Sequence, residues 1–82
     1  TDHPVTPIQY LPLCAAIAVR GGLEPEEALR AITLGGARLA GVAHRVGSLT
    51  PGKDADVVVT SGHPLEWTGS VEHVFINGIQ VK

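Results

Sequence analysis

The stretch Val46–Thr60 reads V-G-S-L-T-P-G-K-D-A-D-V-V-V-T and sets the pattern of the second half of the chain. Pro51 fixes its own φ and Gly52 accepts a positive φ, so the pair predicts a tight turn. β-Branched residues dominate the run from Asp56 to Thr60, which therefore predicts a strand. Because this run is nearly all apolar, we expect it to be buried on both faces. Leu49 is expected in a short strand before the turn.

Before this stretch the apolar spacing is helical. Apolar residues at intervals of three and four predict a first helix that starts at Thr6-Pro7 and stops at Gly21-Gly22. A second helix is predicted to open at Glu24-Pro25, where acidic residues complement the helix dipole. Gly35-Gly36 is expected to interrupt it, and a short helical turn over 37–40 follows, which Gly41 is expected to end.

After this stretch the pattern is extended. Asn77-Gly78 lies between the apolar runs 71–76 and 79–81, and this dipeptide predicts a β-hairpin. Two helices and a helical turn followed by about four strands indicate an α+β fold class. The segment 41–47 is the expected joint, which divides the chain into residues 1–41 and 42–82.

Composition restricts the classes of partner. The chain has 82 residues, 44% hydrophobic and 17% charged, with a formal net charge of −2. It contains no Lys/Arg cluster, so we expect no nucleic-acid partner. The apolar run Leu11–Val19 contains Pro12 and is too short to span a membrane, and no secretory signal is visible, so a cytoplasmic location is expected.

The single cysteine, Cys14, is expected to be a buried, inert thiol. The chain begins within a motif, which predicts a fragment of a longer protein.

Residues that could carry chemistry are few. Asp2, beside His3, could be a metal ligand or a general base, although its position before a helix favours a capping or turn role. The other three histidines, at positions 44, 63 and 73, share no metal-ligand spacing with it and are expected in loops or on the surface. No serine lies in a nucleophile elbow. Spacing alone therefore indicates no complete active site.

Three further features are better explained by a structural role than by catalysis or ligand binding. Gly47–Lys53 matches the glycine spacing of a phosphate-binding loop, but Asp54 replaces the required Ser/Thr. Asp54 and Asp56 are not expected to form an acid/base pair. Trp67 and Phe75 are expected to serve packing.

The chain as a whole resembles the C-terminal part of the amidohydrolase superfamily, closest to imidazolonepropionase-like and Xaa-Pro dipeptidase-like members. The matching blocks are T-D-H-P-V (1–5), A-A-I-A (15–18), G-L-E-P-E-E-A-L (22–29), A-R-L-A-G (37–41), V-G-S-L through D (46–56) and V-E-H-V-F-I-N-G (71–78). The resemblance implies the last element of a (β/α)8 barrel, from the end of strand 8 through helix 8. It also implies C-terminal strands of a small β-sandwich.

By the same resemblance, Asp2 lies at the end of barrel strand 8, where the family uses an Asp as metal ligand and proton carrier. A divalent metal, zinc by first expectation, and hydrolysis of non-peptide or cyclic amide bonds of a small molecule are implied. The family's H-x-H motif, bridging Lys and two further His ligands are absent here. The chain alone is thus expected to be inactive and to hold little or no metal. We expect it to contact the remainder of the barrel, or to self-associate without it.

Two other readings stay open. The chain could be a stand-alone structural or interaction module without catalysis. Alternatively, the parent protein could have Xaa-Pro dipeptidase or phosphotriesterase-like activity.

Overall fold

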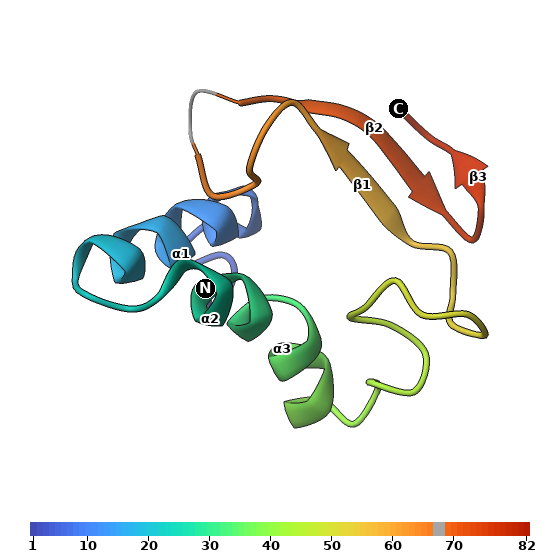
Figure 1. Cartoon of the computed structure of the whole chain (residues 1–82), viewed down its shortest axis with the longest axis horizontal. Coiled ribbons are helices and arrows are strands. Elements are labelled where there is room, and N and C mark those ends of the chain that lie inside the picture. Colours follow the sequence, from blue (N-terminus) through green and yellow to red (C-terminus); the bar gives the residue numbers. More distant parts are fainter. Residues whose placement is uncertain (67–68) are drawn as a thin grey trace.

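A computed structural model describes residues 1–66 and 69–82 and has helices in its first half and one sheet in its second (Figure 1). The helical part consists of the 3-10 helix η1 (Ile8–Tyr10) and the α-helices α1 (Leu11–Arg20), α2 (Pro25–Ala31) and α3 (Leu34–Leu39). The sheet consists of β1 (Val57–Thr60), β2 (Val71–Ile76) and β3 (Ile79–Gln80), antiparallel and in the order β1-β2-β3. The predicted α+β class is confirmed.

The first helix starts later than the sequence pattern predicted. Pro7 precedes the 3-10 turn η1, and the α-helix begins only at Leu11, with Pro12 at its start. Proline has no N–H to donate and is tolerated in the first turn of a helix, so Pro12 marks the start of α1 and does not bend its interior.

Both predicted glycine stops are confirmed. Gly22 has φ 114°, and the N–H of Leu23 donates to the carbonyl of Ala18 at 3.0 Å. Gly41 has φ 76°, and the N–H of Val42 donates to the carbonyl of Ala37 at 2.8 Å. Each is the Schellman pattern, in which a left-handed glycine lets the chain satisfy the last helical carbonyls.

The break between α2 and α3 does not lie at Gly35-Gly36, as predicted, but three residues earlier. The backbone leaves the helix at Ile32 and Thr33, and the Thr33 hydroxyl donates to the carbonyl of Leu29 at 2.8 Å. A Cβ on Gly35 would lie 3.0 Å from the carbonyl oxygen of Arg30, so the glycine allows α3 to fold back closely against the end of α2. The two glycines therefore allow the close corner between α2 and α3, and they do not themselves end α2.

The turn at Pro51-Gly52 is confirmed, but the short strand expected around Leu49 does not form. Gly52 has φ 93°, and the N–H of Lys53 donates to the carbonyl of Thr50 at 3.1 Å. Leu49 is 83% exposed and lies in irregular structure. Without a partner strand among the described residues, this segment bends around its own side-chain hydrogen bonds.

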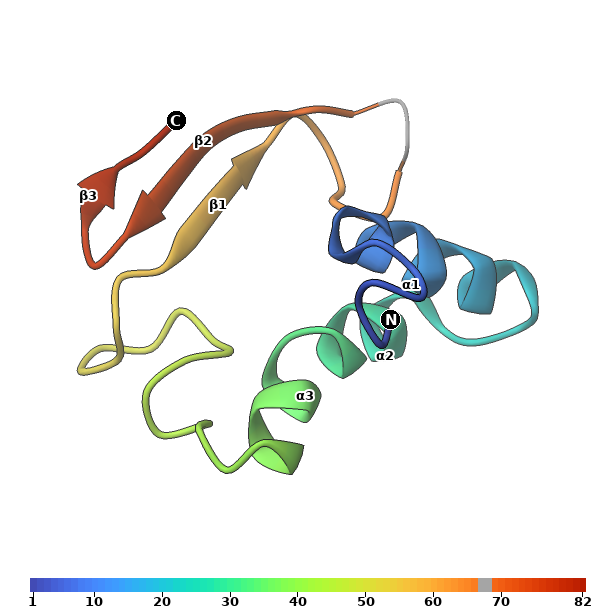
Figure 2. The ribbon, with the colours of Figure 1, turned by 180° about the vertical axis from the view of Figure 1, so that it is seen from behind.

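The hairpin predicted at Asn77-Gly78 is confirmed as the β2–β3 connection. Asn77 and Gly78 have φ values of 51° and 76°, as a type I′ turn requires. β1 pairs with β2 through Val57↔Phe75, Val58↔Val74 and Val59↔His73. The sheet stands away from α1, α2 and α3, as the view from behind also shows (Figure 2).

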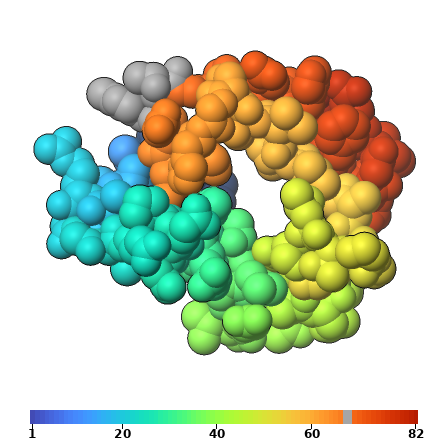
Figure 3. Space-filling view, viewed as in Figure 1, coloured from blue at the N-terminus to red at the C-terminus, as the bar shows by residue number. Residues whose placement is uncertain are grey.

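The core is small. The buried apolar residues of the described chain are Ala15, Ala28 and Ala37, one from each α-helix. The prediction that β1 is buried on both faces is wrong, since Val58 and Val59 are 56% and 38% exposed. Nothing in the described chain covers the sheet, and the space-filling view shows an opening between the helices and the strands (Figure 3).

Two other packing predictions have different outcomes. Cys14 is exposed, not buried, because it lies on a side of α1 that no described element covers. Phe75 is half-buried on β2, whereas Trp67 lies outside the described residues. None of the helices in the described ranges has the length and apolarity needed to cross a bilayer.

Candidate functional site

Asp2 lies in a short loop that precedes η1. The loop closes on itself, because the N–H of Val5 donates to the Asp2 carbonyl at 2.8 Å and the N–H of Thr6 donates to the Thr1 carbonyl at 3.2 Å. Asp2 has φ 51°, a left-handed conformation that Asp adopts more readily than most residues. Its carboxylate is exposed and forms no hydrogen bond or ion pair with the described residues, so it does not act as a helix cap.

His3 has a contact that its sequence neighbourhood did not predict. Its Nδ1 accepts a hydrogen bond from the backbone N–H of Ile8 at 3.0 Å. Ile8 is the first residue of η1, whose N–H groups have no partner within the helix. The imidazole ring therefore satisfies an N–H group at the start of η1, where the N-cap residue Pro7 provides no side-chain hydrogen bond.

Asp2 fits a metal as one ligand only. Carboxylate oxygens are common ligands of divalent ions, and this carboxylate is exposed and not engaged elsewhere. Within residues 1–66 and 69–82, however, no group of three or more His, Cys, Asp or Glu side chains could hold an ion. The described chain thus offers a donor of suitable chemistry but not a complete site.

The other histidines have local partners. The Nδ1 of His63 accepts the N–H of Leu65 at 3.1 Å, and the Nδ1 of His73 lies 3.1 Å from the Nε2 of Gln80. His44 is exposed. Within residues 1–66 and 69–82, these rings do not join a group that could hold a metal ion.

The polar residues of the motif stretch form structural contacts. Lys53 Nζ donates to Ser48 Oγ at 2.7 Å, a contact within the turn itself. Asp54 Oδ2 lies 2.8 Å from Arg45 Nη2, and Asp56 Oδ1 accepts the N–H of Asn77 at 3.0 Å. Asp54 and Asp56 therefore have separate partners and do not form an acid/base pair. Sequence reasoning missed these contacts, because the partners of Asp54 and Asp56 lie 9 and 21 residues away.

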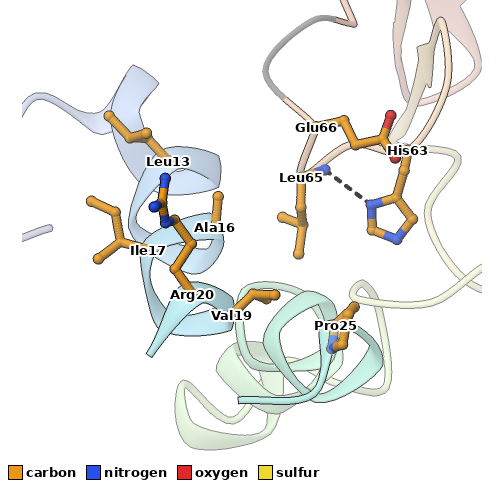
Figure 4. A pocket seen from close by; sticks show the side chains of 9 residues that line it. All are labelled: Leu13, Ala16, Ile17, Val19, Arg20, Pro25, His63, Leu65 and Glu66. Carbon is orange, nitrogen blue, oxygen red and sulfur yellow. Dashed lines mark hydrogen bonds between the residues drawn. The ribbon is translucent and has the colours of Figure 1, made fainter. Parts of the chain in front are cut away.

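An apolar groove of about 690 Å³ runs between α1 and the loop 61–66 (Figure 4). Leu65 lies between Ala16 and Val19 of α1 on one side and His63 on the other. The remaining lining residues are Leu13, Ile17, Arg20, Pro25 and Glu66. Asp2 does not line the groove, so the groove and the candidate ligand are separate features.

Comparison with known proteins decides the family. The sequence matches the Amidohydrolase family over residues 6–81. The chain belongs to the amidohydrolase family. An amidohydrolase from Thermotoga maritima MSB8 has a similar structure, with a TM-score of 0.94 and 44% identity, over 99% of this chain and 21% of that one.

Curated relatives agree with this assignment. The imidazolonepropionase of Geobacillus kaustophilus is 46% identical over 55 residues, which are 66% of this chain and 13% of the relative. The amidohydrolase tasK of Hapsidospora irregularis is 35% identical over 78 residues, 95% of this chain and 8% of the relative. This amidohydrolase-family chain thus spans only a small part of the length of the hydrolases it matches. The family match starts after Asp2 and His3.

Proposed function

We propose that this chain forms the C-terminal part of a metal-dependent hydrolase that acts on carbon–nitrogen bonds of non-peptide or cyclic amides. The observation that carries the proposal is the match to the T. maritima amidohydrolase, close in both sequence and structure over nearly the whole chain. The similarity to an imidazolonepropionase supports a small-molecule substrate.

In the proposed parent protein, residues 1–41 are the last element of a (β/α)8 barrel and residues 42–82 are strands of a β-sandwich. The exposed apolar residues support this arrangement. Ile17 on α1 is 61% exposed and Val58 on β1 is 56% exposed, and each would be covered by a neighbouring part of the parent. The chain alone is inactive in this proposal.

Asp2 is the proposed ligand and acid/base residue. A bound divalent metal, zinc by expectation, would lower the pKa of water toward neutrality. Asp2 would supply one carboxylate ligand to that metal, and its carboxylate would carry a proton from the attacking water to the leaving amine. Asp2 suits this role because its carboxylate is exposed and has no partner in the described chain.

The test uses the full-length parent protein with Asp2→Asn, which keeps the shape of the side chain but removes its basicity. We expect kcat to fall by at least about 100-fold, the low end for loss of an acid/base group. Glu72→Gln, a matched change on the exposed side of β2, should leave kcat unchanged. Wild-type turnover in Asp2→Asn would contradict the proposed role.

The gene upstream of Thr1 separates the enzyme from the stand-alone module. An H-x-H motif near the start of the parent's sequence supports the hydrolase, because it supplies ligands that the described chain lacks. A parent without that motif would contradict the hydrolase and leave the module as the better explanation.

A further inference from the structure

The loop that carries Asp2 is joined to the following helix by a side chain. The backbone hydrogen bonds Val5 to Asp2 and Thr6 to Thr1 close the loop on itself but do not join it to η1. The backbone bond from the Tyr10 N–H to the Pro7 carbonyl, at 3.0 Å, reaches only the residue next to η1. The hydrogen bond from the Ile8 N–H to His3 Nδ1, at 3.0 Å, connects η1 to the part of the loop that carries Asp2. In the described part of the chain, no other side-chain hydrogen bond links residues 1–7 to η1.

This contact constrains the residue next to Asp2. His3 follows Asp2 directly, so a fixed His3 ring restricts the backbone from which the Asp2 side chain projects. An imidazole that accepts at Nδ1 is neutral and has its proton on Nε2. The ring is a stiff acceptor with only two side-chain torsions, which suits it to hold a loop in one shape.

We infer that His3 is a positioning residue, which orients Asp2 by anchoring the loop to the first N–H of η1. The inference rests on the proposed function, because it concerns the direction of the Asp2 carboxylate toward metal and water. Displacement of a reacting group by about 1 Å can lower a rate by roughly 100-fold, so an anchor one residue away has a measurable effect.

Two variants of the full-length parent separate the acceptor from the bulk of the ring. His3→Asn retains an acceptor, because Asn Oδ1 is the same number of bonds from the backbone as His Nδ1. His3→Leu retains a branched side chain of moderate size but has no acceptor. If His3→Leu does not fold, His3→Ala replaces it with the same expectation.

Three measurements apply to each variant. We expect His3→Leu to lower kcat by about 10-fold with a smaller change in KM, since orientation acts on the reacting group. Metal retained after dialysis, measured by inductively coupled plasma mass spectrometry, should also fall. In the metal-free protein, amide exchange of the peptide that contains Ile8 should be about fivefold faster, as loss of one hydrogen bond allows. His3→Asn should remain within about twofold of wild type in all three.

The controls distinguish failure of this inference from failure of the proposed function. Absence of amide hydrolysis by the wild-type parent overturns the proposed function. Wild-type turnover in Asp2→Asn overturns the proposed role of Asp2 and the inference together, and leaves the hydrolase assignment standing. An impaired Asp2→Asn with a His3→Leu that matches wild type in kcat and metal content overturns the inference alone. Equal impairment of His3→Leu and His3→Asn also overturns it, because the acceptor would then not be the cause.

Discussion

Gly47 shows how one residue of the motif joins the two halves of the chain. It has φ 99°, and a Cβ built on it would lie 2.9 Å from the Cβ of Ala37 and 3.0 Å from the Cα of Leu34. Real Cβ atoms do not approach neighbours so closely. The glycine therefore meets two requirements at once: a left-handed backbone and direct contact with α3.

Gly47→Ala should destabilise the protein by about 2–4 kcal/mol, because the positive φ and the overpacking against Ala37 add. Gly52→Ala is the matched control, since Gly52 has φ 93° but nothing within 4 Å of its built Cβ. It should lower the free energy of unfolding by only about 1–2 kcal/mol. Urea denaturation of the parent protein measures both, and equal losses would show that the contact with α3 has no energetic role.

β1 is joined to the β2–β3 hairpin by hydrogen bonds in addition to those of its strand pairing with β2. Asp56, just before β1, accepts the N–H of Asn77 at the turn, and the N–H of Gly78 donates to the carbonyl of Ala55 at 2.9 Å. These bonds hold the tip of the hairpin against the start of β1. Asp54, two residues earlier, pairs instead with Arg45, whose side chain is 62% exposed.

Asp56→Ala should therefore destabilise the sheet by about 1.5–3 kcal/mol, the range for a hydrogen bond to a charged group. Asp54→Ala should change the stability by less than about 1 kcal/mol, because the arginine side of the pair is open to solvent, which weakens the attraction. Amide exchange at Asn77 gives a local measure, and it should accelerate only in Asp56→Ala. Acceleration in both variants would contradict the assignment of the hairpin contact to Asp56.

The chain has too little buried surface for its mass. Its accessible surface is 6045 Å², whereas a compact monomer of 8.5 kDa should expose about 4,700 Å². Its radius of gyration is 13.0 Å, against about 11.7 Å for a compact domain of 82 residues. Both differences agree in direction with the opening seen between the helices and the strands (Figure 3). Large apolar surface is therefore available for contact with other protein.

The chain on its own should self-associate. Leu39 is 93% exposed and Ile17 is 61% exposed, and burial of such side chains favours association. Light scattering over a concentration series should give a mass above 8.5 kDa that rises with concentration. Ile17→Lys should reduce the association if the α1 face takes part. A clean monomer at high concentration would contradict the prediction.

Local signals predicted much of the secondary structure. Gly22, Gly41 and the Asn77-Gly78 pair act through their own φ angles, so their roles could be read from neighbouring residues. The candidate ligand Asp2 could be named only by resemblance, because one carboxylate in a loop has no distinctive spacing. The anchoring contact of His3 was missed because its acceptor role depends on how the loop folds back onto Ile8.

Local backbone preference was thus enough to define the helix stops at Gly22 and Gly41 and the turns of this amidohydrolase-family chain, but not the start of α1 or the break between α2 and α3. Local preference did not predict which side chains are buried, because burial depends on the segments that pack against them. The apolar run of β1 predicted a strand with both faces buried, yet its faces are exposed in the described chain. Cys14 was expected to be buried on its helix, and it is exposed as well. The close approach of Gly47 to α3 and the pairing of Asp56 with Asn77 likewise depend on segments far apart in sequence, which only three-dimensional folding brings together.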